Sequence, residues 1–183
     1  MTQDEFNELR ILDLKAAIEE GLAENNTEYV AYARKQLADL YMEVEDIDKA
    51  KELYEIALED GADDVYENLG LCYYRQGDEN KARELWKRGV DDGDRMCILR
   101  YGLSLVEAHE EDEEIIDKLK SIAEAPDEPE GDACAVLYLH YAWEGDEDAA
   151  WAWREKAIDL ESSLMQALEE DEREEEIGED DWR

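Results

Sequence analysis

The chain has 183 residues, about the size of one domain, and 55 Asp and Glu against 19 Lys and Arg give it a formal net charge of −36. With 10 Gly and 2 Pro, the composition is typical of a helix-rich soluble protein. This charge disfavours direct binding to nucleic acid or to an anionic membrane, because both require basic side chains facing phosphates. We see no signal peptide and no apolar run near the ~20 residues of a membrane span, so we expect a cytoplasmic location without membrane association.

The N-terminal segment predicts a capping helix over residues 2–21. Thr2 and Glu5 have the spacing of a capping box. Apolar residues then recur at helical intervals, at Phe6, Leu9, Leu12, Ala16 and Ile18. We expect this helix to close the N-terminal end of the fold, because a stack of helices otherwise exposes the apolar face of its last member.

The body of the chain contains an internal repeat of 32 residues. A shift of 32 superposes Leu37 on Leu69, Tyr41 on Tyr73, Ala50 on Ala82, Leu53 on Leu85, Tyr54 on Trp86 and Gly61 on Gly93. A shift of 68 superposes Tyr73 on Tyr141, Gly77 on Gly145, Asp78 on Asp146 and Ala82 on Ala150. The third unit is degenerate and fits at Leu119 only with two inserted residues. Each unit has the pattern of two helices around a tight turn, which predicts about four helix-turn-helix units.

The second unit carries a family resemblance. Its pattern of Tyr66, Leu69, Gly70, Tyr73, Ala82 and Trp86, with Gly77 and Asp78 at the turn, resembles the tetratricopeptide repeat and its longer relative, the Sel-one-like repeat. The resemblance implies an all-α protein, a right-handed α-solenoid of about four helix-turn-helix repeats with N- and C-terminal capping helices. It also implies that the first helices line a concave groove that binds peptides.

We expect one helical-repeat domain over residues 1–168, with repeats at about 27–160 and a C-terminal cap at 160–168. Residues 169–183 form an acidic tail that we expect to be solvated, as frayed helix or disorder. Both prolines lie in residues 124–132, which we interpret as a joint inside the domain. The alternative is a linker between two domains.

No constellation of residues predicts catalysis, so we expect a protein that is not an enzyme and has no cofactor or metal site. His109 and His140 cannot form a metal site by themselves, and the carboxylates have no nucleophile or pKa-shifting partner beside them. Cys72, Cys97 and Cys134 fall on first helices, where we expect them to pack in the core rather than to act as reactive thiols.

One face of the first helices is the predicted partner-binding surface, and it becomes apolar in the second half of the chain. Its candidate residues are Tyr32, Lys35, Met42, Asn68, Leu71, Tyr74, Met96, Leu99, Arg100, Leu103, Val106, Leu139 and Trp143. A basic amphipathic helix is the natural ligand, since it meets the apolar stripe with one face and the carboxylates with the other. Alternatively, the stripe is buried core or is covered by the C-terminal helix or tail, including Trp182.

These patterns favour a non-catalytic protein-protein interaction module that binds a protein or peptide partner in its groove. The alternative is an acidic nucleic-acid mimic that sequesters a basic protein, and the charge could also serve solubility alone. The resemblance further suggests a clamp for the C-terminal carboxylate of a peptide at Lys35, Asn68 and Arg100. Asp39 and Met96 depart from the clamp pattern.

Overall fold

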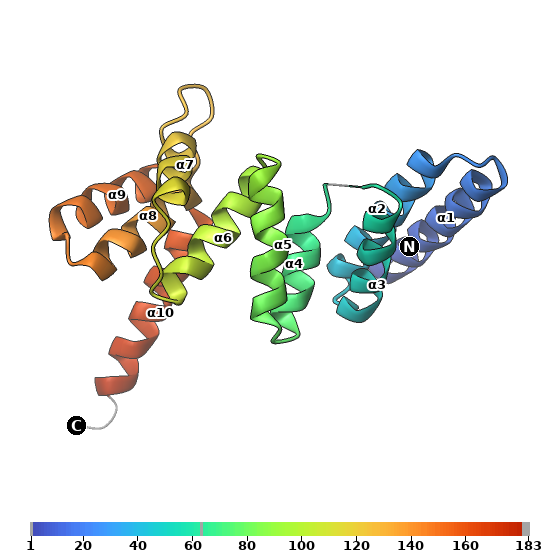
Figure 1. The fold of residues 1–183 in the computed structure, drawn as a ribbon. Helices are drawn as coiled ribbons and strands as arrows, with labels where there is room; N and C mark the ends of the chain where they lie inside the picture. The colour runs from blue at the N-terminus through green and yellow to red at the C-terminus, as the bar shows by residue number, and fades with distance from the viewer. Residues whose placement is uncertain (1, 63, 181–183) are drawn as a thin grey trace. The chain divides into compact units, whose positions relative to one another are not determined.

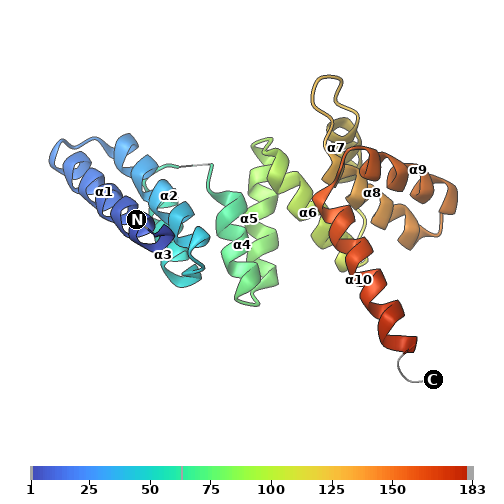
Figure 2. The same cartoon turned by 180° about the vertical axis from the view of Figure 1, so that it is seen from behind.

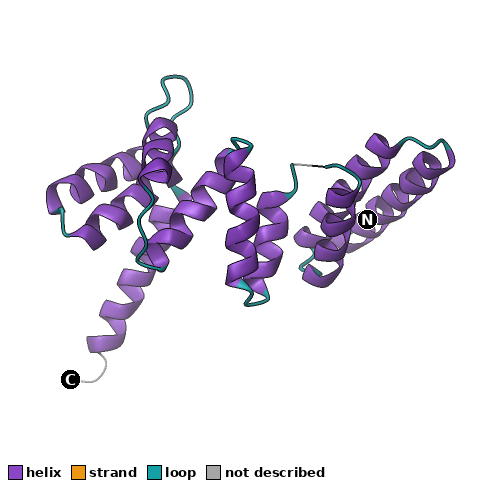
Figure 3. Ribbon diagram, in the orientation of Figure 1, coloured by secondary structure: helices purple, strands orange, loops and turns teal. Residues whose placement is uncertain are grey.

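The computed structural model describes residues 2–62 and 64–180, without the side chains of Asp4 and of residues 172–180. In this described part every regular element is an α-helix (Figures 1 and 3). The helices are α1 (Gln3–Ala23), α2 (Thr27–Glu43), α3 (Ile47–Glu59), α4 (Tyr66–Arg75), α5 (Glu79–Asp91), α6 (Arg95–Glu107), α7 (Glu113–Ala123), α8 (Gly131–Glu144), α9 (Glu147–Asp159) and α10 (Ser163–Asp180). The predicted all-α architecture is confirmed.

The chain divides into two compact units, Met1–Cys97 and Ile98–Arg183, and α6 spans the division. The proline-containing loop, residues 124–130, lies inside the second unit between α7 and α8, so it does not separate the two units. The predicted single domain over residues 1–168, with a separate tail from 169, stays a prediction. The backbone of that tail continues α10 as far as Asp180, and Trp182 lies outside the described residues.

Three helical hairpins share one turn. In each, a residue of positive φ follows the end of the first helix, and this residue is Glu45, Gly77 or Gly145. The backbone N–H of the next residue then donates to a tyrosine carbonyl, from Asp46 to Tyr41, from Asp78 to Tyr73 and from Asp146 to Tyr141, over 2.9, 2.9 and 3.0 Å. The aspartate side chains cap the helices that follow. A backbone hydrogen bond therefore closes each chain reversal, and the aspartate side chain caps the helix that follows it.

The hairpin of α6 and α7, in the degenerate third repeat, has a longer turn. Residues 108–112 connect α6 to α7, whereas residues 44–46 connect α2 to α3. The two inserted residues expected in the degenerate unit are therefore confirmed. Asp112 still caps α7, because its side chain accepts the backbone N–H groups of Glu114 and Ile115.

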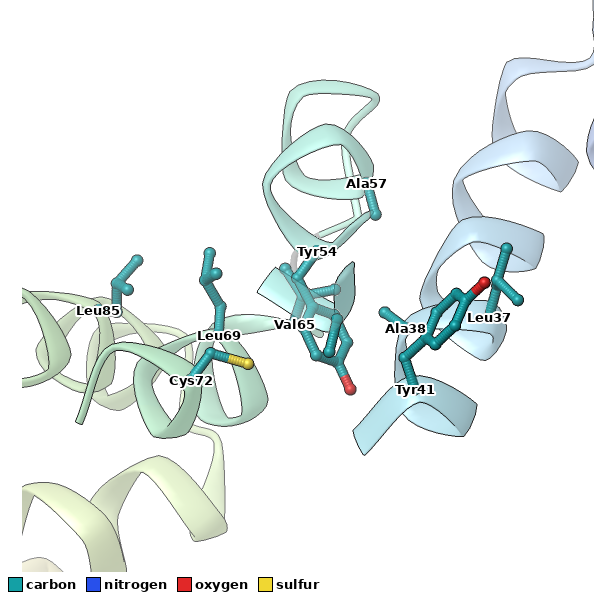
Figure 4. Close-up of a cluster of buried hydrophobic side chains, with 10 residues drawn as sticks. Leu37, Ala38, Tyr41, Tyr54, Ala57, Val65, Leu69, Cys72 and Leu85 are labelled. Carbon is teal, nitrogen blue, oxygen red and sulfur yellow. The ribbon is translucent and has the colours of Figure 1, made fainter. Parts of the chain in front are cut away.

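The core of the first unit lies between α2, α3 and α4 (Figure 4). Its members are Leu37, Ala38, Tyr41, Ala50, Tyr54, Ala57, Val65, Leu69, Cys72 and Leu85. Tyr54 is the largest fully buried side chain in this core, and the alanines beside it let the helix backbones approach closely.

Gly70 makes room for a tryptophan where α4 meets α5. The Trp86 indole packs against α4 and its Nε1–H donates to the Glu67 carbonyl over 3.1 Å. A Cβ atom at Gly70 would lie 2.3 Å from that Nε1 atom, closer than side-chain atoms approach. Position 70 therefore needs a glycine, because the Trp86 ring of α5 occupies the space that a side chain would fill.

Helix α1 forms as predicted but turns a different face inward. The capping box between Thr2 and Glu5 is present, which confirms the predicted start of the helix. The residues that pack against the core are Ile11, Leu14 and Ile18. Three of the predicted inner residues face outward instead, with exposed fractions of 42% at Phe6, 50% at Leu9 and 63% at Leu12. The helix is apolar on both sides, and only one side can contact α2.

The C-terminal helix α10 packs on α8 and α9, as expected for a cap (Figures 1 and 2). Asp132 at the start of α8 accepts the Ser162 hydroxyl at 2.6 Å, the Ser163 hydroxyl at 2.9 Å and the Leu164 N–H at 3.0 Å. Met165 is buried beneath this junction. One carboxylate therefore caps the N-terminus of α10 and holds it on α8.

We expect Gly70→Ala to lower the free energy of unfolding by about 1–2 kcal/mol. Alanine adds up to ~1 kcal/mol of helix propensity, but displacing the Trp86 ring costs ~1–3 kcal/mol. The matched control is Gly102→Ala on α6, where the added Cβ would come closest to Leu119 Cδ1, the end of a flexible side chain, at 2.9 Å, and would meet Ile115 and Val136 at an ordinary contact distance of 3.5 Å. Urea denaturation measures both variants, and equal losses would show that the Trp86 contact is not the cause.

We expect Asp132→Asn to destabilise the protein at pH 7 by about 1–3 kcal/mol. Burial opposes ionisation of Asp132, but its hydrogen bonds from Ser162, Leu164 and Ser163 outweigh it and lower its pKa. A lowered folded-state pKa stabilises the fold above the unfolded-state value, near 4, and this contribution is lost as the pH falls through the folded value. The difference in melting temperature between wild type and variant therefore becomes smaller below about pH 4. Asp159→Asn, at an exposed carboxylate, controls for the lost charge, and an equal effect there would contradict the assignment.

Candidate partner-binding site

A polar junction lies between α2, α3 and α4 of unit one, around the carboxylate of Asp39 on α2. Its Oδ1 atom accepts the Tyr54 hydroxyl from α3 at 2.6 Å and the Asn68 Nδ2–H from α4 at 3.2 Å. Its Oδ2 atom accepts from Lys35 Nζ, one turn earlier on α2, at 3.4 Å. Three helices thus contribute donors to one carboxylate.

The Asp39 carboxylate raises the pKa of both Lys35 and Tyr54. Burial opposes the charge on Lys35, but Asp39 and Asp64, each 3.4 Å from Nζ, raise the pKa of the ammonium above its usual value. Burial, and then the hydrogen bond to Asp39, raise the pKa of the Tyr54 hydroxyl strongly. At neutral pH the junction therefore holds a charged lysine, a neutral tyrosine and, between them, the Asp39 carboxylate.

The structure brings two residues of the predicted carboxylate clamp, Lys35 and Asn68, together around Asp39. Both donate to this carboxylate of the chain itself. The third, Arg100, is half-buried on α6 in the second unit and has contacts of its own. A peptide carboxylate placed at Lys35 would meet the charge of Asp39, which is the departure from the clamp pattern seen in the sequence.

The other predicted residues of unit one differ in exposure. Tyr32, Tyr74 and Met96 are exposed, whereas Leu71 is half-buried. The half-buried Met42 packs on the core, with its sulfur 3.4 Å from the Cys72 thiol. Tyr32 and Lys35 line a cavity of about 340 Å³, together with Thr27, Glu28, Ala31, Asp60, Gly61, Ala62 and Asp64. Tyr32 therefore borders a recess that carries three carboxylates.

One predicted residue of unit two is buried. Leu99 is 6% exposed, so its side chain belongs to the core and is not available to a partner. Counting along α6 placed it on the outer stripe because the degenerate third repeat does not show how that helix is rotated. Leu103, Val106 and Leu139 are half-buried, and Trp143 is exposed.

Both histidines of the chain lie beside Trp143. The His109 ring meets it edge-on at 5.5 Å between centroids, and the His140 ring lies at 6.4 Å. His140 also lines a cavity of about 310 Å³ with Glu111, Asp112, Glu113, Ile116, Asp117, Lys120, Tyr141 and Glu144. Sequence reasoning missed this recess, because a loop and two helices from different repeats form it and no short motif records their proximity.

The three cysteines are buried free thiols, which confirms their predicted place in the core. Burial raises the pKa of Cys72 to about 11, and it also raises the pKa of Cys97 and of Cys134. No group of three or more His, Cys, Asp or Glu side chains in the described part of the chain is placed to hold a metal ion. Among the same residues, no helix is both long enough and apolar enough to cross a bilayer.

Comparison with known proteins identifies the architecture. No protein-family model matches the sequence, and no curated protein is significantly similar to it. Solved structures do match: YrrB, described as a TPR (tetratricopeptide repeat) protein with an unusual peptide-binding site, aligns at 20% identity over 91% of this chain and 89% of its own, with a TM-score of 0.61. The fold is that of the tetratricopeptide-repeat proteins. BtubC from P. vanneervenii aligns at 20% identity over 84% of this chain and 73% of its own, with a TM-score of 0.63. MamA of MSR-1 aligns at 19% identity over 84% and 97%, with a TM-score of 0.55.

The use of the predicted residues as a partner-binding surface stays a prediction. Tyr32, Tyr74, Met96 and Trp143 lie on α2, α4, α6 and α8, which are the first helices of four successive helical hairpins. The resemblance drawn from the second unit is therefore confirmed at the level of the fold. The Sel-one-like relationship stays a prediction.

We expect Tyr54→Phe to lower the free energy of unfolding by about 1.5–3 kcal/mol, since it removes a buried hydrogen bond to a carboxylate. The control is Tyr73→Phe, which removes a similar bond to Glu55 from a half-buried ring that water can reach. We expect that control to cost less, about 0.5–1 kcal/mol. Urea denaturation compares the two, and a smaller loss at Tyr54 than at Tyr73 would contradict a supporting role for the Asp39 junction.

Proposed function

We propose that this chain is a non-catalytic interaction scaffold that binds segments of a partner protein on the first helices of the repeats within each of its two units. One observation carries the proposal: each of these helices presents a large apolar side chain to solvent. The four side chains are Tyr32 on α2, Tyr74 on α4, Met96 on α6 and Trp143 on α8. Aromatic residues and methionine are enriched in protein interfaces, where they supply most of the binding energy.

The charge of the chain indicates the chemistry of the partner. The net charge is −36, and the recess beside Tyr32 carries Glu28, Asp60 and Asp64. A basic segment is attracted to such a surface and an acidic one is repelled. An amphipathic helix with lysine or arginine beside an apolar stripe satisfies both the exposed rings and the carboxylates.

The acidic-mimic alternative makes a different use of the same charge. A mimic of nucleic acid presents carboxylates in place of phosphates and does not depend on exposed aromatic side chains. The exposed rings of Tyr74 and Trp143 are unexplained by that function, and they favour the scaffold.

The test uses a fluorescent amphipathic peptide of ~20 residues with a leucine stripe and lysine flanks, a helix of about 30 Å. We expect the double variant Tyr74→Ala with Trp143→Ala to bind it at least about tenfold more weakly in fluorescence anisotropy, since aromatic anchors contribute ~2 kcal/mol or more. The matched control is Trp151→Ala, an exposed tryptophan on the second helix α9.

An equal loss from Trp151→Ala, or no loss from the double variant, would contradict the proposal. Titrations at about 0.15 M and ~1 M salt distinguish the acidic mimic from the scaffold, because exposed charges are screened at the higher salt concentration. Binding that disappears at high salt, and that none of the three aromatic substitutions weakens, would favour the acidic mimic.

A further inference from the structure

Helix α1 carries an apolar surface outside the predicted groove. Phe6, Leu9 and Leu12 follow one another at intervals of three residues and remain substantially exposed, so they form a stripe that we call the α1 outer face. Beneath it, Ile11 and Leu14 pack against the core of the unit. The outer face is thus a second apolar side of a helix whose first side is already occupied.

The Arg10 side chain borders this face and does not cover it. Its guanidinium carbon lies 5.8 Å from the centre of the Phe6 ring, and its NH1 group pairs with Glu43 of α2 at 2.9 Å. Phe6 stays 42% exposed beside it. A helix that only caps a helical-repeat stack has a polar outer side, whereas α1 is apolar at these positions.

The charges around the α1 outer face select what can cover it. At ~3.6 residues a turn, Asp13 and Glu20 fall within about 40° of Leu9 around the helix, and Glu8 falls within about 40° of Leu12. All three carboxylates are exposed. A second copy of this chain would bring the same carboxylates against them, which disfavours pairing of two α1 helices. A helix with basic flanks would meet them with opposite charge.

We propose that the α1 outer face docks a basic amphipathic helix of another protein, at a site separate from the first-helix surface. Leucine or isoleucine side chains of that helix fill the spaces between Phe6, Leu9 and Leu12, and its lysines or arginines lie over the flanking carboxylates. The chain then has two docking surfaces and holds two helical segments at once, from one partner or from two.

The test uses the full chain and the lysine–leucine peptide, now carrying a photo-crosslinking group, with cross-links located by mass spectrometry. We expect cross-links to residues 3–16 in the wild type, and we expect them to persist in the Tyr74→Ala, Trp143→Ala protein. Leu9→Glu with Leu12→Glu should reduce them at least tenfold. Surface changes of this kind leave the fold intact, which circular dichroism checks.

Leu22→Glu is the matched control, because Leu22 is a leucine of the same helix with a similar exposed fraction of 54%. It lies about 140° around the helix from Leu9, away from the outer face. Unchanged α1 cross-links in the Leu9, Leu12 variant, or an equal loss at Leu22→Glu, would overturn the proposal.

Two further outcomes would also overturn it. Equal cross-linking by a peptide with glutamate in place of lysine would remove the charge argument. A wild-type dimer in sedimentation equilibrium that Leu9→Glu with Leu12→Glu dissolves would assign the face to a second copy. Cross-links on the first helices are scored separately, so failure of the proposed function is distinguishable from failure of this inference.

Discussion

The fold of each unit depends on packing between helices that are neighbours along the chain, with one longer-range contact, of α10 on α8. In the first unit the contacts run from α1 to α2, α3, α4 and α5 in order, and in the second they join α7, α8, α9 and α10. Small residues at the helix contacts, such as Ala50 and Gly70, set the spacing, and large rings such as Tyr54 and Trp86 fill it. In such a linear series of contacts, the first and last helices each have a neighbour on one side only.

The two ends are treated in chemically different ways. At the C-terminal end, Asp132 satisfies the first backbone N–H groups of α10 and turns an acidic side chain into a structural contact. At the N-terminal end, α1 leaves leucines in solvent. The strong negative charge is thus partly structural, because Asp46, Asp78, Asp112 and Asp146 also cap helices, where a carboxylate meets the positive end of the helix dipole.

The sequence predicts the hairpins well because their turns are local. Each turn needs a residue of positive φ followed by a capping aspartate, and Gly77 with Asp78 and Gly145 with Asp146 show both in the sequence. It does not predict which side of α1 faces inward, since both sides are apolar, nor that Leu99 is buried, since the rotation of α6 depends on its packing. The Asp39 junction needs donors from three helices. The one available signal was an acidic residue between two core residues, in the run from 37 to 41.

The Asp39 junction also bears on how the first unit opens. Because Asn68 of α4 donates to the same Asp39 oxygen that accepts the Tyr54 hydroxyl of α3, the α2–α3 hairpin can leave α4 only by giving up the Asn68–Asp39 hydrogen bond. Opening one hairpin at a time, which repeat folds otherwise permit, therefore costs a polar contact at this point in addition to buried apolar surface. We therefore expect the backbone amides of α2, α3 and α4 to exchange with solvent through a shared cooperative opening, as one foldon that is larger than the sequence repeat.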